Sequence, residues 1–191
     1  MYKAVFSDFD GTLLTSDHRI SPKTLDAIQR ITKQGIPLVT GRIASEALAV
    51  IDRLAEGKDA PRFAYGTDYQ VSHQKSVVTG EVFDYTSVVR QGRFQTGLLG
   101  LHQIENAGMA IALLDNFCQE DGRELASNHL ISQALEETSW PGRLEIVSRD
   151  PLMILDGAHN PHAIKALLAT LQERFADYRK EILFTCIKTK A

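Results

Sequence analysis

Two carboxylates placed two residues apart are the first side chains in this sequence suited to catalysis. Asp8 and Asp10 occur in the string DFDGTLLT, directly after the apolar run YKAVFS. One such carboxylate can attack phosphorus, while the other protonates the leaving group and later activates water. Gly11 permits a turn and Thr12 offers a hydroxyl to a phosphate. The structural alternative is an ordinary strand-to-turn junction, where Asp and Gly are common.

Three later strings hold polar side chains suited to a nucleotide: LLGLHQIENAGMAIAL, SWPGRLEIV and LMILDGAHNP. Asn106, in the first, can offer its amide to a purine edge, and Arg143, in the second, can pair with a phosphate. Asp156 and His159 would follow the carboxyl end of a strand, where open α/β sheets bind ligands. Taken singly, each string also fits a local role as a cap, a surface arginine or a strand–helix loop.

The elements that must position these residues alternate along the chain. Apolar runs and caps predict helices over 21–35, 44–56, 102–118, 127–139 and 161–175. Strands are expected at 2–7, 36–40, 143–148, 152–155 and 181–187, and their alternation with helices indicates a parallel α/β layer. Short aromatic and β-branched runs between 62 and 101, broken by glycine, predict antiparallel strands in the middle.

Composition narrows the class of protein. A formal net charge of -3 without a basic cluster argues against a nucleic-acid partner. The two cysteines, Cys118 and Cys186, lie far apart, which fits a reducing, cytoplasmic setting. No secretory signal is expected, and no apolar stretch approaches the roughly 20 residues that span a bilayer. Composition leaves the oligomeric state open.

The string DFDGTLLTSDHRISPKT resembles the Cof-type haloacid dehalogenase-like phosphatases over about residues 1–37. This resemblance implies that Asp8 is the nucleophile, that Asp10 is the general acid and base, and that both belong to a magnesium site. The family's second motif, a Ser or Thr that closes the next strand, would fall at Thr40. Its later lysine and paired acidic motif have no counterpart in the sequence.

Residues 31–191 resemble the folylpolyglutamate synthase/dihydrofolate synthase branch of the Mur ligase family, through KQGIPLVTG, GLLGLHQIENA, WPGRLE and MILDGAHNP. The resemblance implies that Asn106, Arg143, Asp156 and His159 bind ATP. It also implies Mg²⁺ and a reaction in which the carboxylate of a folate or dihydropteroate is phosphorylated and then attacked by the amine of glutamate.

The two resemblances together predict a fusion joined within residues 31–37, with both parent folds incomplete. The expected fold class is α/β, with Rossmann-like parallel strands and helices and a short antiparallel β segment in the middle. Expected domains are a dehalogenase-like strand–loop–helix at 1–35, the end of an ATP-binding central domain at 36–139 and the start of a C-terminal domain at 140–191.

No GxxxxGK[ST] phosphate-binding loop occurs in the sequence. A ligase fragment that is inactive alone is therefore expected. The alternatives are a magnesium-dependent phosphatase that forms an aspartyl phosphate, and a non-catalytic remnant that binds nucleotide weakly.

Overall fold

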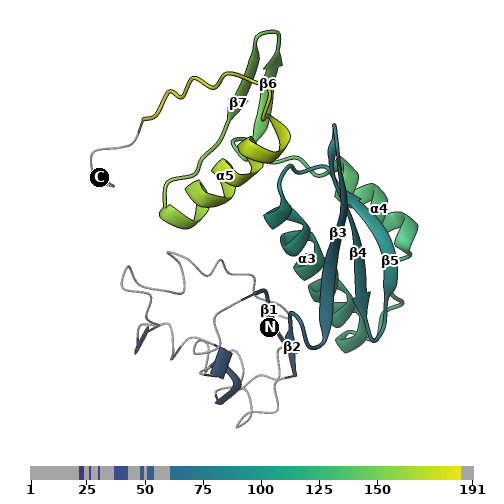
Figure 1. The fold of residues 1–191 in the computed structure, drawn as a ribbon. Coiled ribbons are helices and arrows are strands. Elements are labelled where there is room, and N and C mark those ends of the chain that lie inside the picture. The colour runs from purple at the N-terminus through teal and green to yellow at the C-terminus, as the bar shows by residue number, and fades with distance from the viewer. Residues whose placement is uncertain are drawn as a thin grey trace. The chain divides into compact units, whose positions relative to one another are not determined.

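The computed structural model describes residues 61–185 continuously, and also residues 22, 23, 26, 30, 37–42, 48, 49 and 51–53. Within these residues two compact units separate. One contains 61–70, 86–91, 108–126 and the described N-terminal positions, and the other contains 71–85, 92–107 and 127–185. The strands are β1 (Leu38–Thr40), β2 (Arg62–Ala64), β3 (Tyr69–Val77), β4 (Gly80–Ser87), β5 (Gln91–Thr96), β6 (Glu145–Arg149) and β7 (Leu152–Leu155), and the helices are α3 (Leu101–Glu120), α4 (Asn128–Glu137) and α5 (Pro161–Arg174) (Figure 1).

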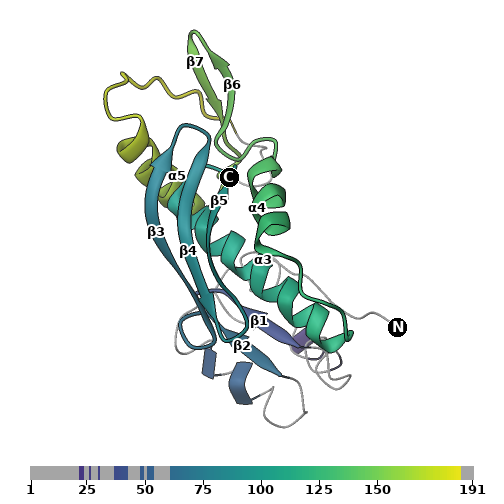
Figure 2. The same cartoon turned by 90° about the vertical axis from the view of Figure 1, so that its right-hand side faces the viewer.

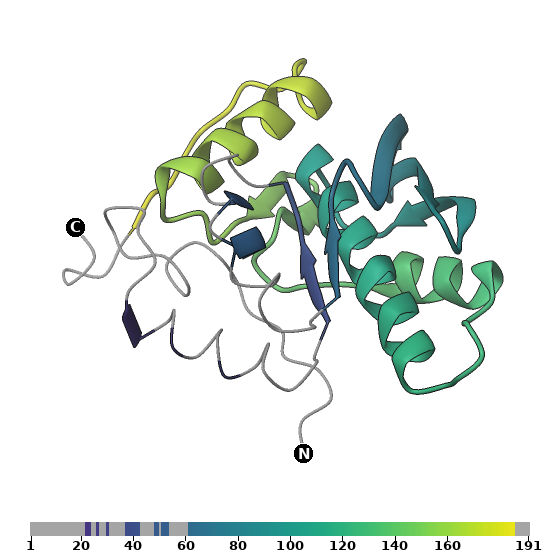
Figure 3. The same ribbon diagram turned by 90° about the horizontal axis from the view of Figure 1, so that it is seen from below.

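In the first unit, β1 and β2 form a parallel pair (Figure 3), in which Leu38 lies opposite Arg62 and Thr40 opposite Ala64. The sequence-based expectation of an antiparallel strand at 62–66 was therefore wrong. The connection from β1 to β2 is long enough for the crossover that parallel pairing needs. The Tyr69 hydroxyl donates to the Thr40 carbonyl at 2.9 Å, which ties the end of β1 to the start of β3.

A buried ion pair crosses the same unit. Arg90 donates to both carboxylate oxygens of Asp115, at 2.8 and 2.7 Å, and the two side chains are 5% and 2% exposed. The Arg90 guanidinium also donates to the Ala126 carbonyl at 2.8 Å. The turn before β5 is thereby fixed to α3 and to the segment that precedes α4.

In the second unit, β3, β4 and β5 form a three-stranded sheet in that order (Figure 2). Short turns join the strands, so neighbours run antiparallel, as predicted. Phe83, Tyr85 and Phe94 are almost fully buried and pack against one another, with ring centroids 6.0 Å apart for Phe83–Phe94 and 6.4 Å for Tyr85–Phe94. These aromatic rings form the centre of the hydrophobic core of the sheet.

Helices α3 and α4 were both expected from the sequence. Ser127 caps α4 by accepting from the Leu130 N–H at 3.2 Å. The Gly97 N–H donates to the Leu135 carbonyl at 2.9 Å, which holds the C-terminal turn of α4 beside the end of β5. Helix α3 has 20 residues and buries Ile104 and Ile111. None of the described helices combines the length and apolar character that a membrane crossing requires.

The last third of the described chain consists of the β6–β7 hairpin and α5 (Figure 1). Its two strands are antiparallel, with Glu145 opposite Leu155 and Arg149 opposite Leu152. A turn of two residues joins β6 to β7 and can join only antiparallel strands. The parallel pairing expected from the strand–helix–strand alternation concerned 152–155 and 181–187, and the described part of 181–187 forms no strand. Residues 181–185, predicted as part of a strand, form none, and residues 186–187 of that prediction lie outside the described chain.

Candidate functional site

Hydrogen bonds join the turn before β6 to the loop after β7. The Asp156 carboxylate accepts from the Leu144 N–H at 2.9 Å through one oxygen and from the Ala158 N–H at 2.8 Å through the other. A backbone bond of 2.7 Å from the Gly157 N–H to the Gly142 carbonyl runs beside them. The strings WPGRL and LDGAHNP, separate in the sequence, therefore form one structural unit.

Leu144 shows why Asp156 is needed there. It has φ of 48°, a left-handed conformation that is uncommon for residues other than glycine. Its side chain is only 3% exposed, so burial offsets the strain while Asp156 binds its N–H. Sequence analysis predicted Asp156 as a nucleotide ligand. In the structure its carboxylate oxygens accept hydrogen bonds from backbone N–H groups of the two loops.

Two of the predicted ligands are exposed on these loops. Arg143 lies in the turn directly before Leu144 and is exposed to solvent. His159 is also exposed, and its Nδ1 lies 2.9 Å from the Gly157 carbonyl oxygen. Asn160 caps α5 by accepting from the Ala163 N–H at 2.8 Å, with Pro161 at the first helical position, as the sequence predicted. The loop therefore presents His159 from a well-defined backbone.

Asn106 lies on α3 and not in either loop. Its side chain is exposed, and its amide nitrogen donates to the Gln103 side-chain oxygen at 3.0 Å. Gln103 in turn lies 3.0 Å from the His102 ring nitrogen. The structure thus brings Arg143, Asp156 and His159 onto joined loops, and it holds Asn106 on a separate helix of the same unit.

A shallow cleft of about 300 Å³ lies beside the turn before β6. Trp140 and Arg143 line it, together with Val78 and Thr79 from the β3–β4 turn. Asn106, Asp156 and His159 are not among its lining residues. The four predicted ligands therefore do not share this cleft.

The predicted magnesium ligands, Asp8 and Asp10, lie outside the described residues. Across the part of the chain that the structure describes, no group of three or more His, Cys, Asp or Glu side chains is placed to hold a metal ion. Since Mg²⁺ requires several oxygen ligands, the described residues do not fit a magnesium site of their own. Exposed Arg143, Asn106 and His159 do fit polar contacts to a nucleotide.

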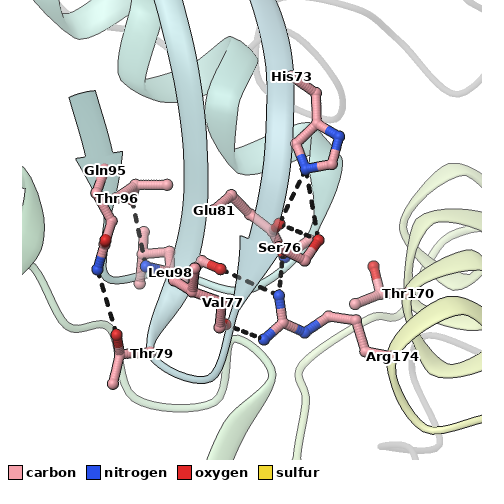
Figure 4. A network of polar contacts seen from close by, with 12 residues as sticks. His73, Ser76, Val77, Thr79, Glu81, Gln95, Thr96, Leu98, Thr170 and Arg174 are labelled. Carbon is pink, nitrogen blue, oxygen red and sulfur yellow. Dashed lines mark hydrogen bonds and ion pairs between the residues drawn. The ribbon is translucent and has the colours of Figure 1, made fainter. Parts of the chain in front are cut away.

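Sequence analysis missed a buried polar cluster around Glu81, which is 0% exposed at the start of β4 (Figure 4). Arg174, near the end of α5, donates to the Glu81 carboxylate at 2.6 Å, and Ser76 donates to its other oxygen at 2.5 Å. The available signal was a charged residue directly before the apolar pair Val82–Phe83 of a predicted strand, because a buried carboxylate requires a partner.

Two protein families match the chain in separate segments. Residues 5–61 match the family of haloacid dehalogenase-like hydrolases, and residues 142–191 match the glutamate ligase domain of Mur ligases. The first match reaches beyond residue 37, where the phosphatase resemblance was expected to end.

Similar proteins divide in the same way. A dihydrofolate synthase/folylpolyglutamate synthase of Bacillus subtilis is 33% identical over 161 residues, which cover 84% of this chain and 37% of that protein. A putative phosphatase of Haemophilus influenzae is 69% identical over 39 residues, 20% of this chain and 15% of that protein. A solved folylpolyglutamate synthase complex with AMPPCP and folate aligns with a TM-score of 0.68 and 28% identity, over 76% of this chain and 37% of that one.

The chain thus spans well under half the length of the ligases that it resembles. The predicted ligase resemblance is confirmed over most of the chain, and the predicted phosphatase resemblance is confirmed at its N-terminus. Over most of its length the chain resembles the folylpolyglutamate synthase/dihydrofolate synthase branch of the Mur ligases, and its N-terminal segment resembles the haloacid dehalogenase-like hydrolases.

Proposed function

We propose that the chain carries part of the nucleotide site of a folylpolyglutamate synthase-type ligase, and that alone it binds ATP without completing the ligase reaction. The observation that supports this most directly is the pair of joined loops, in which Asp156 binds the Leu144 N–H and thereby sets the turn that carries Arg143. The similar solved ligase was studied as a complex with AMPPCP and folate.

In this proposal each side chain has a separate task. Arg143, exposed beside the fixed turn, pairs with a phosphate, and Asn106 offers its amide to the purine. His159 supplies a further polar contact, while Asp156 keeps the two loops in register. ATP, when bound, supplies the phosphoryl group that activates a carboxylate for amide formation.

We expect no ligase turnover from this chain alone, because its sequence lacks a loop of the type that holds the β- and γ-phosphates. No GxxxxGK[ST] loop occurs in the sequence, so nothing of that type cradles the β- and γ-phosphates. In phosphoryl transfer, catalysis rests almost entirely on positioning and charge stabilisation of these groups. A folate or dihydropteroate and glutamate are the substrates proposed for the complete ligase.

Titration with ATP tests the proposal. Trp140 is the single tryptophan and is 65% exposed three residues before Arg143, so its fluorescence can report binding. We expect Arg143→Ala to weaken ATP binding by about tenfold or more, the loss that accompanies one charge-assisted hydrogen bond. Arg179→Ala is the matched control, because the Arg179 side chain is 90% exposed outside both loops. Failure of the wild-type chain to bind ATP, or equal affinity in Arg143→Ala, would refute the proposal.

A second candidate function rests on the phosphatase relative, which is 69% identical over 39 residues. In that case Asp8 and Asp10 release phosphate from a sugar phosphate with Mg²⁺, and Asp8→Asn abolishes the activity. Ligase turnover would instead require both the folate-type substrate and glutamate. A chain that binds ATP but releases phosphate under neither condition is the outcome expected here.

A further inference from the structure

Among the residues that the structure describes, Glu81 is the most deeply buried carboxylate, and the proposed function gives it no task. Its side chain is fully buried, and its two oxygens accept hydrogen bonds from three different parts of the chain. One oxygen accepts from the Gly100 N–H at 2.8 Å and from Arg174 at 2.6 Å, and the other accepts from Ser76 at 2.5 Å. Such a set of donors compensates the cost of burying the charge.

Arg174 brings the end of α5 to the β3–β4 hairpin. Besides Glu81, its guanidinium donates to the Gly80 carbonyl at 3.1 Å and to the Val77 carbonyl at 2.5 Å, as Figure 4 shows for Val77 and Glu81. These two carbonyls lie on either side of the turn between β3 and β4. His73, on β3, adds a ring nitrogen 3.4 Å from Glu81.

The start of α3 contacts α5 independently of Glu81. Gly100 has φ of 104°, and a Cβ added there would lie 2.8 Å from the hydroxyl oxygen of Thr170. Thr170 lies on α5 and is 3% exposed. Only glycine therefore fits between the two helices at this position.

The elements that meet at Glu81 are also the ones that carry the proposed nucleotide ligands. Asn106 lies on α3, which begins directly after Gly100. Helix α5 begins directly after the loop that contains Asp156 and His159. We propose that Glu81 is a positioning residue, which holds the start of α3 and the end of α5 together and so sets the placement of Asn106 relative to that loop. This inference rests on the proposed nucleotide site.

The test compares Glu81→Gln with Asp84→Asn in the full chain. Both replace a carboxylate on β4 by an amide of the same size, but the Asp84 side chain is 38% exposed and paired with Arg93 at the surface. Amide hydrogen exchange is measured over residues 100–106 and 161–174, and ATP affinity is measured at a temperature at which each variant is folded by circular dichroism. The second variant is Arg174→Lys, which keeps the positive charge but loses the planar guanidinium and its several N–H donors.

Glu81→Gln should accelerate exchange in both segments and weaken ATP binding, each by about tenfold or more, the factor lost with one charge-assisted hydrogen bond. Arg174→Lys should change both readouts in the same direction, and Asp84→Asn should change neither. Faster exchange in one segment only, or unchanged ATP affinity in a folded Glu81→Gln chain, would overturn the positioning role. If Glu81→Gln does not fold, the same two readouts in Arg174→Lys decide.

If the wild-type chain does not bind ATP, the proposed function is refuted, and so is the role of Glu81 in positioning the nucleotide ligands. The hydrogen-exchange measurement would still show, independently of ATP, whether Glu81 joins α3 to α5. The two failures are therefore distinguishable.

Discussion

Replacing Asp115 by alanine removes one half of a buried ion pair and leaves the other half in place. In the wild-type chain Arg90 donates two hydrogen bonds to Asp115, at 2.8 and 2.7 Å, and the two side chains are 5% and 2% exposed. After the substitution, the Arg90 guanidinium loses this neutralising carboxylate, although its bond to the Ala126 carbonyl can remain.

The expected loss of stability is large. Removing one partner of a buried ion pair costs about 3–5 kcal/mol, because the remaining charge is left in a medium that solvates it poorly. This is a substantial part of the roughly 5–15 kcal/mol that stabilises a typical domain. For a urea dependence of about 2 kcal/mol per molar, the unfolding midpoint falls by about 1.5–2.5 M.

Urea unfolding followed by circular dichroism measures this change. The matched control is Asp84→Ala, which breaks an Arg–Asp pair of similar geometry, with 2.7 and 3.0 Å bonds from Arg93, on side chains that are 63% and 38% exposed. Solvent screens that pair, so the control should leave the midpoint almost unchanged. The double replacement Arg90→Met with Asp115→Leu should recover most of the loss, because it also removes the buried positive charge that Asp115 neutralises.

Equal midpoints for Asp115→Ala and Asp84→Ala would refute the reasoning. So would a double replacement less stable than Asp115→Ala, since that result would place the cost in packing and not in the loss of the carboxylate beside the Arg90 charge.

Three further predictions concern the caps, turns and surface charges. Asn160→Ala removes the cap of α5 and should lower the free energy of unfolding, measured with urea, by about 1 kcal/mol. Arg179→Ala, the control outside the helix, should leave the free energy of unfolding unchanged. Gly80 has φ of 154°, and a Cβ added there would lie 1.7 Å from the Thr96 carbonyl oxygen, so Gly80→Ala should prevent stable folding. Gly122 has φ of 65° with open space around it, so Gly122→Ala should lower the free energy of unfolding by only about 1–2 kcal/mol. The hydrogen bond from Arg93 lowers the pKa of Asp84, so the stabilisation by this pair is present above the ordinary Asp pKa and is lost as the pH falls through the lowered value. NMR titration should show that Arg93→Ala returns the pKa of Asp84 toward its ordinary value, and an unchanged pKa in that variant would contradict this assignment.

Local patterns accounted for the elements with strong periodicity or punctuation. The helix beginning at Pro161 was predictable from Asn160 and Pro161, since a cap and a first-turn proline act within one turn of the chain. The sheet of β3, β4 and β5 was predictable because its strands are joined by short turns. Arg143 and His159 were singled out by residue type and by resemblance, and the structure brings their loops together.

Pairing direction and buried charges were not predictable in the same way. Residues 62–64 have the composition of a strand, but whether they pair with β1 or with β3 depends on a partner distant in the sequence. Residues 181–185 likewise have strand-like composition but no strand partner in the described chain. Strand propensity is largely a matter of neighbours, so composition alone does not decide it.

The sequence by itself determined the two family resemblances, the helices with clear caps and the candidate ligands Asn106, Arg143, Asp156 and His159. Only the tertiary structure decided that Asp156 binds the Leu144 N–H and that Glu81 binds both Gly100 and Arg174. The physical reason is that a carboxylate withdrawn from water, fully as at Glu81 or partly as at Asp156, is stabilised by whichever donors the fold brings within hydrogen-bond distance. Leu144 lies 12 positions from Asp156, and Gly100 and Arg174 lie 19 and 93 positions from Glu81, beyond the reach of any local pattern.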